Sequence, residues 1–415
     1  MRALKWVVIG SGGVLALLVI TALILTQLVD PNRYRGPIER QVTAATGRAF
    51  RLQGDIELTF FPWLSLTTGA AELSSPAGFP EPQFLRWRDA HVGVRLLPLL
   101  RGELVVDRVR LVGLEARLLR AADGRENWTF ESGNPDARGT LPDIEGIELR
   151  ESQLFYADEA SGTRLRLDGL RLDVEPVRTG VPMRVEAAAT VSSPAAPERA
   201  SVNIATVVTL GPPLLLANTE VSGKLLDGRF AEGGVPWRFA APRLSYAPVA
   251  GTVAAPEWGL DFNEARIRGA TMAALGDGLS ASGTLSLAPV SLRETLAAAG
   301  IELPPTRDPN AYRTVKFGAG FRVAGQSLQI EPLDIVLDDT RLTGRVTREE
   351  GVLRFALRGD RMDLGRYLKP EGAPGEPFVL PIAALKALHA EGTLDIDEAT
   401  LEGVQMKGVR LSAGP

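Results

Sequence analysis

Apolar and polar residues alternate with a period of two over most of the chain beyond Phe50. In the segment RLRLDGLRLDV, the apolar positions are Leu165, Leu167, Leu172 and Val174, and arginine and aspartate lie between them. Successive side chains of a strand point to opposite faces of a sheet, so this pattern predicts a strand with one apolar and one charged face. Half-buried strands of this kind are typical of antiparallel sheets.

The same alternation returns in the segments GELVVDRVRL, ASVNIATVVTL and GVLRFALRGD. Their apolar positions include Leu104, Val106, Val202, Ile204, Leu353, Phe355 and Leu357. Strand-like segments recur about every 10 to 15 residues, separated by Gly, Asp and Pro turn signals, which gives roughly twenty strands. The fold class is therefore predicted to be mostly β.

Helical spacing appears in three short segments of the body. The first, NRYRGPIERQVTAATG, places Ile38, Val42 and Ala45 on one face and ends at Gly47, and the others are 291–300 and 382–390. The first helix either caps one end of the β-body or contacts lipid, and its pattern fits both.

The segment from Trp6 to Val29 carries no charge over about 24 residues, which is long enough to cross the roughly 30 Å hydrocarbon core of a bilayer. It has no small-x-small cleavage site of the kind that follows a signal peptide, so an uncleaved membrane anchor is predicted. Arg2 and Lys5 precede the span, and the positive-inside rule places residues 1–5 in the cytoplasm. The body from Asp30 onward is then expected on the far side of the membrane.

Composition and charge exclude several classes of function. The 46 basic and 50 acidic residues give a net charge of -4 and contain no basic block, so a nucleic-acid partner is not expected. The chain has no cysteine and only two histidines, His91 and His389, which removes the usual ligands of zinc, iron-sulfur clusters and haem. No cofactor and no metal site are predicted.

Catalytic patterns are also missing from the sequence. Asp338 and Asp339 are neighbours, which a strand would turn to opposite faces, so they are interpreted as turn or capping residues. The cluster DIDE at 395–398 lacks the spacing and the glycine of an EF-hand and is read as a charged outer face. No nucleophile, phosphate-loop or metalloprotease motif occurs, and the chain is not expected to be an enzyme.

Three short helices cannot cover the apolar face of so many strands. The sheet folds on itself as a sandwich, closes as a barrel, or curls into a trough filled by lipid chains, and periodicity does not choose between these solutions.

Two regions of the chain resemble the AsmA family. The first is DPNRYRGPIERQVTAATGRAFRLQGDIELTFFPWLSL with LLPLLRGELVVDRVRLVGLEARLLRAADGRENW, and the second is LRETLAAAGIELPPTRDPNAY with LDDTRLTGRVT and LRFALRGDRMDLGRYL. The middle of the chain is similar only in its β-character. The resemblance implies an inner-membrane-anchored periplasmic protein linked to outer-membrane assembly and lipid homeostasis, similar to the bridge-like lipid transfer proteins.

The resemblance favours an elongated, curled antiparallel sheet with an apolar trough over the sandwich. The predicted organisation is a cytoplasmic N-terminus at 1–5, a transmembrane helix at 6–29, an AsmA-type module at 30–135, a β-rich middle at 136–289 and a later AsmA-type module at 290–415. Family members are often longer, so this last module is expected to continue beyond a truncated C-terminus.

The leading functional hypothesis is that the body shields and guides phospholipid, or another diacyl lipid, between the inner and outer membranes. The apolar positions from Leu104 to Leu357 named above are the candidates to contact acyl chains. The alternative is a non-enzymatic assembly or chaperone factor that binds outer-membrane proteins through open sheet edges.

Overall fold

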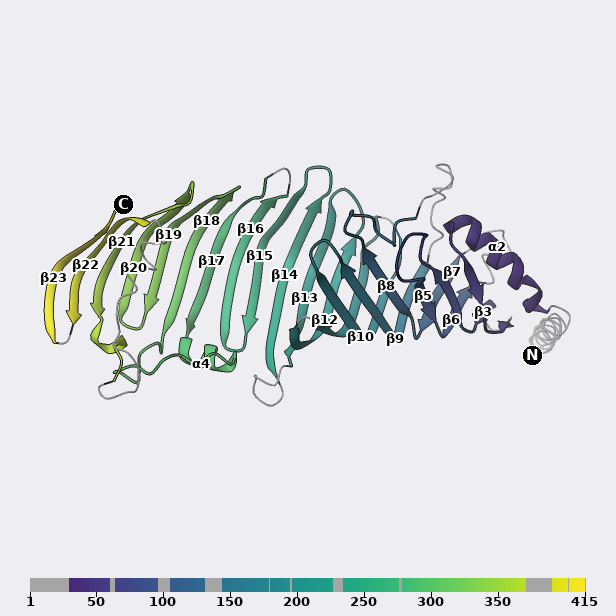
Figure 1. Cartoon of the computed structure of the whole chain (residues 1–415), viewed down its shortest axis with the longest axis horizontal. Helices are drawn as coiled ribbons and strands as arrows, with labels where there is room; N and C mark the ends of the chain where they lie inside the picture. The colour runs from purple at the N-terminus through teal and green to yellow at the C-terminus, as the bar shows by residue number, and fades with distance from the viewer. Residues whose placement is uncertain are drawn as a thin grey trace, which may run out of the picture. The chain divides into compact units, whose positions relative to one another are not determined.

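In a computed structural model of the chain, the described residues are 30–59, 64–95, 105–130, 144–178, 180–194, 196–226, 234–275, 278–370, 390–401 and 403–414. They are mostly strands with a few short helices, which confirms the predicted class (Figure 1). The contacts divide the chain into two compact units, unit 1 at Met1–Asn203 and unit 2 at Ile204–Pro415. This division falls inside the predicted middle region.

The predicted span from Trp6 to Val29 lies outside the described residues, and so does the predicted helix at 382–390, except for Ala390, which is the first residue of the strand Ala390–Leu401. Over the described part of the chain, no helix combines the length and the apolar character needed to cross a membrane.

Unit 1 begins with two helical elements, followed by short strands and then long ones. The elements are η1 (Pro31–Tyr34), α2 (Arg35–Thr46), β1 (Phe50–Leu52), β2 (Ile56–Thr59), β3 (Leu64–Thr68), β4 (Ala71–Ser74), β5 (Gln83–Trp87), β6 (Asp89–Val94), β7 (Val106–Val112), β8 (Glu115–Arg120), β9 (Ile144–Asp158), β10 (Thr163–Glu175), β11 (Met183–Ser193) and β12 (Ala196–Thr209), whose last residues belong to unit 2.

The short strands of unit 1 are halves of bent strands that form successive hairpins. Strand β1 pairs with β4, and β2 pairs with β3. On their other edges, β4 pairs with β5 and β3 pairs with β6. Strand β5 then pairs with β8, and β6 pairs with β7. The first bend lies between β1 and β2, and there the backbones of Gly54 and Gly69 are in contact. The site has no room for a side chain, since a Cβ on Gly54 would lie 2.4 Å from the Cα of Gly69. Strand β9 then runs parallel to both β7 and β8, so the predicted antiparallel pairing does not hold at this strand.

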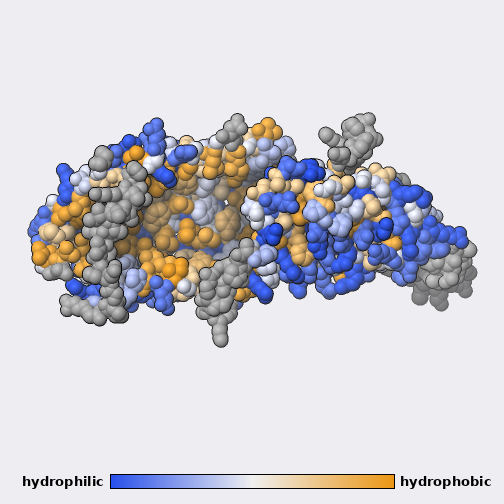
Figure 2. Space-filling view, in the orientation of Figure 1, coloured by the Kyte–Doolittle hydropathy of each residue, from blue (hydrophilic) through white to orange (hydrophobic). Residues whose placement is uncertain are grey.

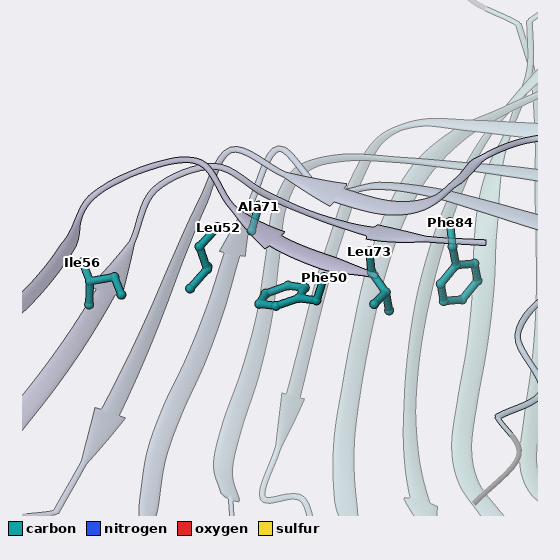
Figure 3. Close-up of a cluster of buried hydrophobic side chains, with 6 residues drawn as sticks. All are labelled: Phe50, Leu52, Ile56, Ala71, Leu73 and Phe84. Carbon is teal, nitrogen blue, oxygen red and sulfur yellow. The ribbon is translucent and has the colours of Figure 1, made fainter. Parts of the chain in front are cut away.

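The core of unit 1 lies at its first strands. In Figure 3 the side chains of Phe50, Leu52, Ile56, Leu73 and Phe84 point to the same side of their strands. Ile38 and Val42 of α2 pack against this cluster, which is the apolar stripe that the sequence predicted, although Ala45 is exposed.

Helix α2 also closes the free edge of the sheet by hydrogen bonding. The Glu39 carboxylate accepts from the amide of Leu52 at 2.8 Å, and the Thr43 hydroxyl accepts from the amide of Phe50 at 3.3 Å. Unpaired amides of an edge strand otherwise invite another strand. Capping of the β-body, one of the two roles expected for this helix, is therefore present in the structure.

Unit 2 is an open sheet of long strands that curve along their length (Figure 1). The elements are β13 (Leu214–Leu225), β14 (Val235–Ala247), β15 (Thr252–Phe262), β16 (Ala265–Ala274), β17 (Ser280–Val290), α4 (Leu292–Ala298), β18 (Val315–Ala324), β19 (Ser327–Leu337), β20 (Thr340–Glu349), β21 (Val352–Asp363), η3 (Gly365–Tyr367), β22 (Ala390–Leu401) and β23 (Val404–Ala413). Each strand pairs with the next, antiparallel except for the parallel pair β21–β22.

A glycine on β16 makes room for an aromatic ring, and we expect its replacement to destabilise unit 2. A Cβ on Gly269 would lie 2.5 Å from the indole of Trp258 and 2.8 Å from the carbonyl oxygen of Thr284. Gly269→Ala should lower the free energy of unfolding by about 2 kcal/mol, since overpacking forces neighbours off their preferred positions. Urea unfolding of the full chain in detergent, followed by tryptophan fluorescence, measures this.

Gly318 on β18 provides the matched control. A Cβ at this position meets nothing within 4 Å, so Gly318→Ala should leave the unfolding midpoint nearly unchanged. Equal midpoints for the two variants would contradict the packing of Trp258 over Gly269.

Candidate functional site: the apolar face of unit 2

One row of register partners crosses unit 2 from β13 to β23, and it is apolar at every position. Side chains directly opposite each other in paired strands share a face of the sheet. We call this set the apolar row: Val221, Phe239, Leu260, Ile267, Leu287, Phe317, Ile335, Leu342, Gly359, Ile396 and Val409. The apolar row contains no titratable group.

The adjacent row, one residue away on every strand, lies on the opposite face and is largely polar. We call it the outer row: Glu220, Ala240, Gly259, Arg268, Ser286, Gly318, Asp334, Thr343, Arg358, Asp395 and Arg410. Its charges are paired, for example Arg341 with Asp334 at 2.8 Å. The hydrogen bond from Arg341 holds the pKa of Asp334 below its usual value, and Arg410 does the same to the pKa of Asp395.

The side chains of the apolar row are only half-buried over most of its length, although large apolar residues are usually found in the interior of a folded protein. Among the described residues, the extensive contacts of each strand of unit 2 are with its neighbours in the sheet, and no helix or strand makes comparable contacts across the apolar row as a second layer. Figure 2 shows this part of the molecule hollowed, with apolar residues lining the hollow. The apolar row is therefore the floor of an open, apolar hollow.

Aromatic side chains contribute to this floor. Phe239 stacks on Trp258 with ring centroids 6.3 Å apart, and the indole N–H of Trp258 donates to the hydroxyl of Thr271 at 3.0 Å. Gly392 lies against Phe355, since a Cβ at this position would meet the backbone carbonyl of Phe355 and lie 2.9 Å from its ring. The glycines opposite these rings leave room for them, because a Cβ at Gly269 or Gly392 would meet the aromatic residue opposite it.

Four of the predicted lipid-contact residues lie in unit 2. Leu353, Phe355 and Leu357 on β21 are half-buried and pair with Arg348, Val346 and Gly344 on the face of the apolar row. Ile204 in β12 is also half-buried. The structure thus brings the three β21 residues together on the hollow, and their contact with lipid stays a prediction.

The other predicted residues that the structure describes lie in unit 1, and Leu104 falls outside the described residues. Leu167, Leu172 and Val174 pair with Leu154, Leu149 and Ile147 of β9 on one apolar face. The two halves of β10 keep this face because the register shifts between Asp168 and Arg171, at a glycine with φ 63. Leu165 is exposed, Val202 is half-buried, and Val106 is buried in the sheet.

The paired aspartates have the structural role that the sequence indicated. Asp338 lies in a turn with φ 49, and its carboxylate accepts hydrogen bonds from the amides of Tyr312, Arg313 and Thr314 and from the Tyr367 hydroxyl. Burial raises the pKa of Asp338, but these donors outweigh it, so the pKa lies below the usual value. The neighbouring Asp339 is exposed and pairs with Arg366.

The remaining polar candidates also have structural partners. Asp397 pairs with Arg358 on the outer face. His91 is half-buried and shares a hydrogen bond with the Thr67 hydroxyl at 3.1 Å, and His389 lies outside the described residues. Within the described ranges no group of three or more His, Cys, Asp or Glu side chains is placed to hold a metal ion.

Comparison with known proteins supports one family. A family model described as "AsmA family" matches residues 1–364. Two similar proteins of Escherichia coli (strain K12) are "Protein AsmA", 30% identical over 166 residues that cover 38% of this chain and 26% of that protein, and "AsmA family protein YhjG", 26% identical over 136 residues that cover 30% and 20%. The chain therefore matches only a small part of the length of these relatives. No solved structure matches the chain.

Proposed function

The chain belongs to the AsmA family, and from this premise we propose that unit 2 shields the acyl chains of a phospholipid, or of another diacyl lipid, along its apolar row. The observation that carries the proposal is the unbroken apolar floor from β13 to β23, opposite a charged outer row and without a covering layer among the described residues. A protein that keeps such a face from water needs an apolar partner.

The energetics suit an acyl chain. Each buried methylene contributes about 0.8 kcal/mol, so a chain of ~16 carbons gains on the order of 10 kcal/mol before ordering costs. Hydrophobic burial is non-directional, so a floor without a specific pocket holds the chain and still permits sliding. The absence of titratable groups from the apolar row fits carriage rather than catalysis.

We further propose that this shielding serves the cell envelope. The uncharged segment from Trp6 to Val29 would anchor the protein in the inner membrane, with the body in the periplasm. The body would then guide lipid between the inner and outer membranes and support outer-membrane biogenesis.

Photocrosslinking from neighbouring positions tests the proposal. Benzoylphenylalanine at Phe321, which lies on the hollow side as the register partner of Ile330, should yield phospholipid adducts when the full chain is irradiated in native membranes. The same group at Arg322, on the outer face opposite Gln329, should not. Mass spectrometry of the adducts measures both, and no lipid adduct at position 321 would refute lipid shielding.

One observation favours a second function, the binding of outer-membrane proteins or their assembly factors. Strand β23 pairs only with β22 in the part of the chain that the structure describes, and Val404 and Leu411 on it are exposed. An open edge of this kind accepts a further strand. This function predicts protein adducts from β23 and none of phospholipid from position 321.

A further inference from the structure

The residues that follow the proposed membrane anchor are fixed to the sheet of unit 1 without a linker. The side-chain oxygen of Asn32 accepts a hydrogen bond from the amide of Ile56 at 3.1 Å. Arg35 donates to the carbonyl oxygen of Gly54 at 2.8 Å. Asp30 caps η1 by accepting from the amide of Asn32 at 3.0 Å. The first residues beyond the anchor are therefore held at the bend between β1 and β2.

The helical elements η1 and α2 have an inner side on the sheet and an outer side in solvent. Ile38 and Val42 on the inner side pack against the core cluster. In Figure 1, α2 lies at the end of the sheet that its first strands form. We call the exposed outer side the docking face: Arg33, Tyr34, Pro37, Arg40, Gln41 and Ala44.

The charges on the docking face have one sign. Over residues 31–47 the exposed charged side chains are Arg33 and Arg40. The one acid of this stretch, Glu39, is half-buried and is turned to the sheet, where it accepts a backbone amide. Arg33 approaches Asp30 only at 3.9 Å, and Arg40 makes no hydrogen bond or ion pair with the residues that the structure describes. Arginines with so few partners are complementary to an anionic surface.

The sequence shows which anionic surface lies within reach. The proposed anchor ends at Val29, so Asp30 would lie at the boundary of the hydrocarbon core. A 3-10 helix rises about 2 Å per residue, so Tyr34 lies within ~8 Å of that boundary in any orientation of η1. The headgroup layer is roughly 5–7 Å thick, which puts Arg33 and Tyr34 in it or at its outer limit.

Arg40 also stays close to the headgroups. It lies six residues beyond Tyr34 in the helical segment, which adds at most ~9 Å at a rise of 1.5 Å per residue. This distance leaves Arg40 roughly one Debye length from the headgroup phosphates, even if the helix points straight away from the membrane. Arginine binds phosphate with two parallel hydrogen bonds, and tyrosine is enriched at the membrane surface.

From these observations we propose that the docking face binds the anionic headgroups of the bilayer that holds the anchor. The body then stands directly on the membrane surface and is not tethered through a linker. The inference rests on the proposed anchoring of the segment from Trp6 to Val29, and it is independent of lipid shielding by unit 2. Each arginine near an anionic surface strengthens such a contact about fivefold.

The absence of cysteine from the chain makes the test direct. The full chain with Gln41→Cys, labelled with the fluorophore NBD, is placed in nanodiscs of equimolar phosphatidylcholine and phosphatidylglycerol. A minor share of the lipid carries a nitroxide quencher on its headgroup. We expect at least half of the NBD fluorescence to be quenched.

The control for position is Glu159→Cys in the turn between β9 and β10. Strand β9 follows β1 in the order β1–β4–β5–β8–β9, which places it roughly 19 Å farther across the sheet. NBD at Glu159 should be quenched far less than NBD at Gln41.

The control for charge uses a second pair of exposed arginines. Arg33→Glu combined with Arg40→Glu should remove at least half of the quenching at Gln41. Arg164→Glu combined with Arg171→Glu makes the same change of charge on β10 and should leave the quenching as it is. All four side chains are exposed, so the unfolding midpoints of both variants should equal that of the parent protein.

The outcomes separate docking from anchoring. Absence of quenching at Gln41 in a chain that stays with the nanodiscs overturns the docking and leaves the anchor intact. A chain that elutes apart from the nanodiscs refutes the anchor, and the docking with it. Equal quenching at Gln41 and Glu159, or equal loss in both charge variants, also overturns the proposal. Phospholipid adducts from position 321 test lipid shielding separately from all of these results.

Discussion

Replacing Phe355 with aspartate should remove at least nine tenths of the phospholipid that copurifies with the full chain. Phe355 lies on the hollow face between Leu353 and Leu357, opposite Val346. An ionised carboxylate there either stays hydrated, which brings water into the hollow, or loses its hydration against acyl chains at a cost of several kcal/mol. A loss of 1.4 kcal/mol in binding already corresponds to a tenfold loss of lipid.

The control for this change is the neighbouring residue on the same strand. Ala356 is exposed on the opposite face and pairs with Arg345, so Ala356→Asp adds the same charge at a place where it gains a partner. Both variants should remain folded, because Phe355 is only half-buried. Lipid extraction with quantitative mass spectrometry of the two proteins, purified in the same mild detergent, compares them.

Equal phospholipid content in the two variants would show that the hollow does not hold lipid. Partial loss restricted to Phe355→Asp would locate the lipid along β21, and the same pair of changes at Leu342 and Thr343 on β20 would map its extent. A variant that loses lipid and also unfolds is uninformative about binding, so each lipid measurement is paired with an unfolding midpoint.

The alternation of residues predicted the faces of the strands well but not their connections. In unit 2 the residues Leu353, Phe355 and Leu357 share the face of the apolar row, as their spacing indicated. In β10 the alternation changes phase, and only the register shift near Gly169 shows why Leu172 and Val174 stay on the face of Leu167. The parallel pairs of β9 and of β21–β22 were missed, since the connections before β9 and β22 are long, and a long connection, unlike a short hairpin turn, permits a parallel as well as an antiparallel pair.

The sequence predicted only part of the candidate site, and the reason is physical. Periodicity reports that one face is apolar but not what covers it, so Val106, which is buried, and Leu165, which is exposed, looked alike in the sequence.

Replacing Asp338 with asparagine should lower the free energy of unfolding of the full chain by about 2 kcal/mol at neutral pH, because hydrogen bonds to a charged acceptor are worth more than neutral ones. The Asp338 carboxylate accepts three backbone amides at 2.8 to 3.0 Å and the Tyr367 hydroxyl at 2.9 Å. Asparagine tolerates the left-handed backbone at this position, so the change isolates the loss of charge. Asp339→Asn is the control, since its side chain is 78% exposed and its single ion pair contributes little.

The same bonds make unit 2 sensitive to acid through Asp338. Its pKa in the folded protein lies below the ordinary 3.8, so the unfolded chain binds this proton first as the pH falls. The stability due to the ionised carboxylate is therefore complete above the unfolded pKa and is lost as the pH drops through the folded one. Asp338→Asn should differ from the parent protein at pH 7 and approach it below pH 3.8, as measured by urea unfolding at both pH values. A difference that stayed constant with pH would mean that Asp338 acts through backbone geometry and not through its charge.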